Sequence, residues 1–110
     1  MGLSPSEFLP QEAGERRRSE RLPLRKDVRI YWPDRGVESS EDTFTLTVSL
    51  FGCAIASRGH LQPDSQIVLR CDGKFMPGRV LYNLHDSSKD FIEVGISFDE
   101  EAGEFWDSQF

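Results

Sequence analysis

The chain has 110 residues, of which 37% are hydrophobic and 29% are charged, and these values predict one soluble globular domain with a single core. Its formal net charge of -6 argues against general nucleic-acid binding, which needs a broad basic face. No apolar run approaches the roughly 18 residues of a membrane span and no signal-peptide pattern is present, so we expect a cytoplasmic protein without a membrane partner. The two cysteines are too few for a disulfide framework and are expected to be free thiols.

The amino-terminal part of the chain combines a predicted flexible tail with a cluster of arginines. Residues 1–14 contain two prolines and two glycines and show little periodicity, which is typical of a flexible tail. Arg16, Arg17, Arg18 and Arg21 then follow within six residues of an otherwise acidic chain. Guanidinium groups fit phosphate bidentately and stack on flat rings, so this cluster indicates a site for a compact anion. A solvated basic linker is the alternative interpretation.

Alternation of apolar and polar residues begins after Pro23 and predicts a first, half-buried strand. In this strand Val28, Ile30 and Trp32 are expected to face the core. The Pro-Asp-Arg-Gly sequence at 33–36 predicts a turn, and the polar stretch 38–42 is expected to separate this strand from the next.

The second predicted strand has one face on the core and one face in water. Its apolar residues are Phe44, Leu46 and Val48, and its polar residues are Thr43, Thr45, Thr47 and Ser49. A tight turn or bulge is expected before a short apolar segment at 52–56.

The second half of the chain predicts a hairpin and a last strand. Asp72-Gly73 lies between strand-like runs at 67–71 and 74–84, and this pair favours a type I′ turn, which needs positive φ at both central positions. Pro77-Gly78 is typical of a bulge or an edge. A polar loop at 85–90 is expected before a clear strand at 91–98.

The acidic tail predicts a short amphipathic helix over residues 99–110, with Asp99 at or near its N-cap. The aromatic residues of this helix, Phe105, Trp106 and Phe110, are placed to plug an open end of a barrel. About six short strands joined by tight turns predict an all-β fold, namely a small antiparallel barrel. We therefore divide residues 15–110 into an arginine loop (15–22), a barrel (23–98) and a C-terminal helix (99–110).

Two groups of residues indicate the function. Arg17 and Arg21 form an RxxxR spacing before the first strand, and two arginines so spaced in a loop can close around a ligand from opposite sides. About 25 residues later, Thr47 and Ser49 share the polar face of the second predicted strand, and Gly52 leaves room for a ring or phosphate to approach the backbone. No nucleophile motif and no metal-ligand spacing accompanies them, so we expect no enzymatic activity, no cofactor and no metal site.

Together these groups resemble the PilZ family of bacterial cyclic di-GMP receptors, which carries RxxxR followed by D/N-x-S-x-x-G on a six-stranded antiparallel β-barrel. Arg17 and Arg21 match the first motif, Ser49 and Gly52 match the second, and residues 94–98 are similar to the last barrel strand of the family. The resemblance covers roughly residues 15–100 and implies a second-messenger receptor with cyclic di-GMP as its ligand.

Thr47 stands where the family has Asp or Asn. A carboxylate there accepts from guanine N1–H and N2–H together, and its loss costs about 1.5–3 kcal/mol, or roughly tenfold to a hundredfold in affinity. One alternative is therefore a degenerate PilZ domain that acts as a protein-interaction adaptor without nucleotide. A more distant alternative is an OB-like barrel that stacks single-stranded nucleic acid on Tyr31, Trp32 and Phe51, which the acidic balance opposes.

Arg16 is a third candidate for the ligand site. Cyclic di-GMP can form an intercalated dimer, and a third guanidinium suits its extra guanine or phosphate. We therefore predict two nucleotides per chain, with Arg16 holding the second, and an exposed Arg16 without a role is the alternative. The resemblance implies a conformational output, in which the arginine loop folds onto the barrel and an unidentified downstream protein receives the signal.

Overall fold

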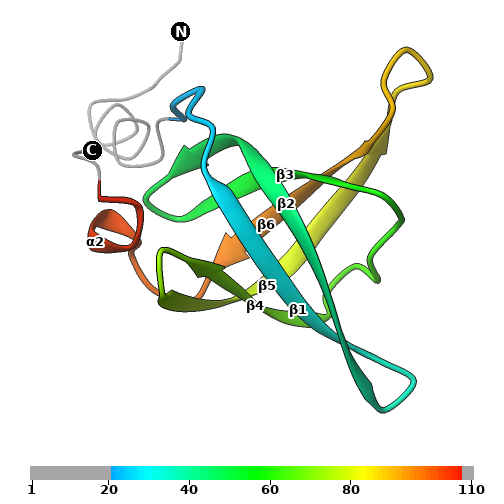
Figure 1. Cartoon of the computed structure of the whole chain (residues 1–110), viewed down its shortest axis with the longest axis horizontal. Helices are drawn as coiled ribbons and strands as arrows, with labels where there is room; N and C mark the ends of the chain where they lie inside the picture. The colour runs from blue at the N-terminus through cyan, green and yellow to red at the C-terminus, as the bar shows by residue number, and fades with distance from the viewer. Residues whose placement is uncertain (1–20, 108–110) are drawn as a thin grey trace, which may run out of the picture.

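The structure is a computed structural model that describes residues 21–107 (Figure 1). Within this range, six antiparallel strands close into a barrel in the order β1–β2–β3–β6–β5–β4. The strands are β1 (Asp27–Asp34), β2 (Val37–Ser49), β3 (Gly52–Ser57), β4 (Gln66–Cys71), β5 (Lys74–His85) and β6 (Ile92–Phe98). A four-residue helix, α2 (Gly103–Trp106), follows the last strand. The predicted all-β fold, a six-stranded antiparallel barrel with a short C-terminal helix, is confirmed.

Two of the hairpins turn on consecutive residues with positive φ. Asp72 (φ 53°) and Gly73 (φ 79°) join β4 to β5, which confirms the hairpin that the Asp-Gly pair predicts. Arg35 (φ 55°) and Gly36 (φ 80°) join β1 to β2 in the same way, because such turns match the right-handed twist of the strands.

The stretch 38–42, predicted to be a connection, is part of β2. It pairs with β1 in an unbroken register that runs from Asp27 opposite Phe44 to Asp34 opposite Val37. Cross-strand pairing therefore overrides the polar character of this stretch. Because β4 pairs with β1 only over residues 29–31, the tip of the β1–β2 ribbon projects from the barrel (Figure 1).

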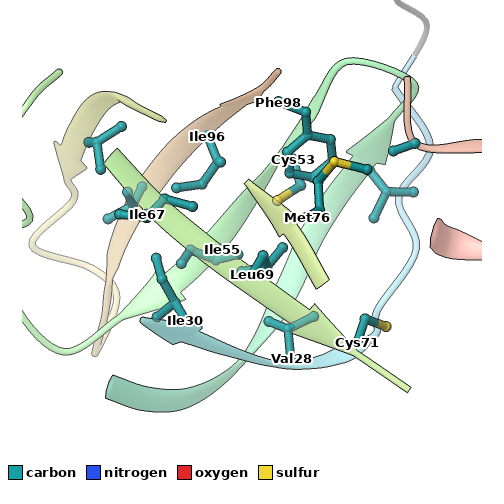
Figure 2. Packing of buried hydrophobic residues seen from close by; sticks show 14 of the residues in the cluster. Val28, Ile30, Cys53, Ile55, Ile67, Leu69, Cys71, Met76, Ile96 and Phe98 are labelled. Atoms are coloured by element: carbon teal, nitrogen blue, oxygen red, sulfur yellow. The ribbon is translucent and has the colours of Figure 1, made fainter. Parts of the chain in front are cut away.

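The core fills the interior of the barrel with apolar side chains from every strand. Ile30, Ile55 and Leu69, from β1, β3 and β4, are completely buried and lie between the walls (Figure 2). Cys53 and Cys71 are also buried, and both are free thiols, as expected. The pattern of the first strand is confirmed, with Val28 and Ile30 buried and Trp32 packed against the core from one side.

The predicted water-facing side of the second strand is wrong at Ser49, which is 7% exposed, and at Thr45, which is 1% exposed. Its Oγ1 donates to the carbonyl oxygen of Leu24 at 2.7 Å and accepts from the backbone N–H of Lys26 at 2.8 Å. The register between β2 and β3 shifts between Thr45 and Thr47, and this bulge changes which residues face inward. The hydroxyl of Thr45 thus satisfies backbone groups of the segment that enters β1.

Pro77-Gly78 is predicted to mark a bulge or an edge, and the register of β5 shifts farther along, between Val80 and Tyr82. Pro77 itself pairs with Val68 of β4, and the ladder between β5 and β6 begins only at Gly78. Proline therefore occupies a position where no hydrogen bond from its nitrogen to β6 is needed.

Helix α2 is shorter than predicted and begins later. Ala102 is its N-cap and makes no side-chain capping bond, so the predicted start at Asp99 is wrong. The N–H of Asp99 instead donates to the carbonyl oxygen of Pro77 at 3.1 Å. Phe105 and Trp106 are buried and lie with their ring centroids 5.9 Å and 5.7 Å from that of Phe98, while Phe110 lies outside the described residues. No helix in the described part of the chain is long and apolar enough to cross a membrane.

Candidate functional site

The segment that precedes β1 lies along the last residues of β2. The N–H of Leu22 donates to the carbonyl oxygen of Val48 at 2.8 Å, and the N–H of Val48 donates to that of Leu22 at 2.9 Å. This pair is an antiparallel bridge, and the partly buried Leu22 side chain packs against the core. The antiparallel register places Arg21 beside Ser49. The second arginine of the RxxxR motif therefore lies next to the second motif.

The other two arginines predicted to bind ligand have no described position. Arg16 and Arg17 lie outside the described residues, so Arg21 represents the arginine loop in the structure. Arg21 is exposed, as a ligand-binding arginine must be.

Two further arginines of the basic amino-terminal half have structural roles. The guanidinium of Arg25 lies 3.9 Å from the ring centroid of Phe44, which is a cation–π contact. Arg29 binds Asp42 with two parallel hydrogen bonds of 2.8 Å, from Nε and from Nη2. The first contact joins the segment before β1 to β2, and the second joins β1 to β2.

Ser49 and Gly52, the two residues that match the second motif, shape the turn between β2 and β3. The hydroxyl of Ser49 donates to the carbonyl oxygen of Gly52 and accepts from the N–H of Phe51, both at 3.3 Å. A Cβ atom at Gly52 would lie 2.1 Å from the carbonyl oxygen of Ile96. Glycine is therefore required by the close approach of β6, and the space that the sequence assigned to a ligand at this position is filled by backbone.

The hydroxyl of Thr47 forms no hydrogen bond with the described residues. The residue is half-buried, and its Oγ1 is buried without a hydrogen-bond partner in the described part of the chain. Because an unpaired buried hydroxyl costs free energy, a ligand that bonds this atom would gain from it. Among residues 21–107, no group of three or more His, Cys, Asp and Glu side chains is arranged to hold a metal ion.

Thr47 belongs to a row of four residues that crosses the outside of the barrel. It pairs with Ala54 of β3, Ala54 pairs with Gly95 of β6, and Gly95 pairs with Tyr82 of β5. Residues paired across strands point to the same face, so these four share the outer surface. A Cβ atom at Gly95 would lie 2.1 Å from a carbon of the Tyr82 ring, which means that the ring covers Gly95.

Arg21 reaches this row from the side of β2. Burial raises the pKa of Tyr82, the hydrogen bond to Glu93 raises it further, and a hydrogen bond with Arg21 acts in the opposite direction. The positive charge of Arg21 also acts on the thiol of Cys53 in β3, although burial dominates there and raises the pKa of this thiol. Arg21 is therefore a neighbour of the Tyr82 hydroxyl.

Tyr82 and Glu93 are two further residues of the candidate site, and the sequence did not indicate them. The hydroxyl of Tyr82 donates to Oε2 of Glu93 at 2.7 Å. The two residues come from different strands, and no local motif joins either of them to the arginines. In the structure Ile92 and Val94 are buried in the core, so Glu93 between them lies on the outer face of β6.

Helix α2 and the residues before it, although distant in the sequence, contact the turn between β2 and β3. The indole Nε1 of Trp106 donates to the carbonyl oxygen of Ser49 at 2.9 Å, and the N–H of Ala102 donates to that of Leu50 at 2.8 Å. The N–H of Phe98 donates to the carbonyl oxygen of Phe51, also at 2.8 Å. Three successive carbonyl groups of the turn are thus bound by the C-terminal segment.

Comparison with known proteins relates this barrel to one family of domains. No family model and no curated protein matches the sequence. Among solved structures, the chain is similar to the PilZ domain of CeSA from a cellulose-synthesizing bacterium, with a TM-score of 0.51 and 19% sequence identity over 72% of this chain and 80% of that one. This likeness concerns the arrangement of the strands, and it agrees with the resemblance that the two motifs carry. The chain therefore has a PilZ-like fold.

Proposed function

We propose that this chain is a receptor for cyclic di-GMP that binds the nucleotide on the outer face formed by β2, β3 and β6. The observation that carries the proposal is the bridge between Leu22 and Val48, which brings Arg21 to the turn at Ser49–Gly52. An exposed guanidinium beside a half-buried, unpaired hydroxyl suits a ligand that combines phosphate with a polar ring. The PilZ-like fold supports the same function.

The residues of the two motifs have different roles in the proposed binding of the nucleotide. Arg17 and Arg21 hold phosphate and guanine, and Arg16 holds the second nucleotide of an intercalated dimer. Thr47 contacts the ligand through its free hydroxyl, whereas Ser49 and Gly52 set the path of the turn. Binding orders the arginine loop, residues 15–22, onto the barrel, and a downstream protein reads this change.

The alternative is an adaptor that binds a protein partner and no nucleotide. Thr47 favours it, because a hydroxyl accepts fewer hydrogen bonds from guanine than a carboxylate does. The position of Arg21 opposes it, because an adaptor has no need for an exposed arginine held beside the second motif.

An isothermal calorimetric titration of the whole chain tests the proposal. Cyclic di-GMP should bind, whereas GTP and a single-stranded oligonucleotide should bind at least tenfold more weakly. Arg70→Ala is the matched control for the arginines, because Arg70 is an exposed residue of β4, on the far side of the barrel from β3. No detectable binding of cyclic di-GMP by the folded protein would leave the adaptor as the function.

A further inference from the structure

We propose that Glu93 supplies the carboxylate that recognises guanine in this site, in place of the acid that is absent at position 47. The inference rests on the proposed receptor function and deepens it, because it names the residue that sets the base specificity.

The first argument is the position of Glu93. It lies on β6, two residues before Gly95, and pairs with Ala56 of β3. Alternate residues of a strand share a face, so Glu93 is on the same outer surface as the row that joins Thr47 to Tyr82. Its Cα lies about 7 Å along the strands and about 10 Å across them from Thr47, two strands away. A base held near Glu93 can therefore belong to a nucleotide whose other parts reach Thr47 and Arg21.

The second argument is that the carboxylate is oriented but not saturated. A carboxylate has about four lone-pair sites, and the Tyr82 hydroxyl occupies one of them on Oε2. Glu93 is half-buried, and it forms no salt bridge with any described residue. Within residues 21–107 no hydrogen bond is made to Oε1, and the two oxygens together match the adjacent N1–H and N2–H donors of guanine.

The third argument concerns how the carboxylate is held. Gly95 lacks a side chain, and this lets the Tyr82 ring lie over β6 with its hydroxyl at Glu93. A hydrogen bond with Arg21 also acts on the same hydroxyl. The positive charge of Arg21 compensates the repulsion between the carboxylate and the phosphates of a nucleotide. Tyr82 is thus a positioning residue, and Glu93 is the residue that contacts the base.

This arrangement discriminates between bases. Guanine presents two adjacent donors to a carboxylate, inosine presents one because it lacks the N2 amine, and adenine presents an acceptor at N1. The site should therefore prefer cyclic di-GMP to cyclic di-IMP, and both to cyclic di-AMP.

Titration of these three ligands into the wild type, Glu93→Gln, Tyr82→Phe and the control Glu38→Gln tests the assignment. Glu38 is an exposed glutamate of the projecting β1–β2 ribbon. Glu93→Gln should lose about tenfold to a hundredfold in affinity for cyclic di-GMP and most of its preference over cyclic di-IMP. Tyr82→Phe should lose about fivefold, because it removes one neutral donor, and Glu38→Gln should behave like the wild type.

The outcomes separate the two proposals. A wild type that binds cyclic di-GMP, together with a folded Glu93→Gln variant that keeps the wild-type affinity and preference, overturns the role of Glu93 and leaves the receptor function intact. A wild type that binds none of the three ligands overturns both. Equal thermal midpoints for the wild type and Glu93→Gln establish that a loss of binding is not a loss of fold.

Discussion

Trp106 Nε1 lies 2.9 Å from the carbonyl oxygen of Ser49, 57 residues earlier in the chain, and donates a hydrogen bond to it. The indole is completely buried. This bond ties the C-terminal helix to the turn that carries the second motif, so the last helix belongs to the support of the candidate site.

Trp106→Phe should lower the free energy of unfolding by about 2–4 kcal/mol, because a buried carbonyl loses its donor and the smaller ring leaves a cavity. Urea denaturation measures this change. Trp32→Phe is the control, since Trp32 is the other tryptophan and is only partly buried. Equal losses for the two variants would show that the bond to Ser49 is unimportant. We also expect Trp106→Phe to bind cyclic di-GMP more weakly than Trp32→Phe does.

Arg17→Ala and Arg21→Ala should each weaken binding of cyclic di-GMP by about 1.5–3 kcal/mol, because each removes a charge-assisted pair with the ligand. The fold should be retained, since Arg21 is exposed and contributes no side chain to the core. Lysine at either position should restore the affinity only in part, because an ammonium group can neither bind phosphate with two parallel hydrogen bonds nor stack on a base. Calorimetry, with Arg70→Ala as the control, measures the effect. A variant with both substitutions and wild-type affinity would refute the proposal that Arg17 and Arg21 hold the ligand.

Thr47→Asp should tighten binding by about tenfold if a carboxylate at this position accepts from guanine as it does in the family. The buried, unpaired Oγ1 of Thr47 indicates that the position faces a polar partner. Weaker binding would instead mean that position 47 lies near a phosphate, which a carboxylate repels. Unchanged affinity would place the residue outside the site.

Arg16→Ala should lower the number of cyclic di-GMP molecules bound per chain from two toward one, because the proposed function assigns the second nucleotide of an intercalated dimer to Arg16. Arg17→Ala should instead weaken binding whether one or two nucleotides bind per chain, and this difference separates the roles of the two arginines. The measurement is a titration at protein concentrations well above the dissociation constant. One nucleotide per wild-type chain would contradict the prediction.

Features that depend on a few neighbouring residues could be predicted from the sequence. The hairpin at Asp72-Gly73 is an example, because positive φ at both positions is a local requirement. The PilZ resemblance also rested on short motifs, and Arg21 and Ser49 do lie together. The fold followed from the spacing of such local signals along the chain.

Features decided by distant partners could not be predicted in this way. Thr45 is buried because a bulge in β2 and the segment before β1 meet there. Helix α2 begins at Gly103 rather than near Asp99, which is bound to the backbone of β5 instead. Tyr82 and Glu93 enter the candidate site because the order of strands places β5 beside β6.

Val48 and Ser49 are consecutive residues, yet their hydrogen-bond partners come from opposite ends of the described chain. The backbone of Leu22 forms two hydrogen bonds with that of Val48, and the indole of Trp106 donates one to the carbonyl group of Ser49. Contacts from both ends of the described chain therefore meet at the same two residues. A substitution at Leu22 and one at Trp106, which are far apart in the sequence, are expected to disturb the same turn.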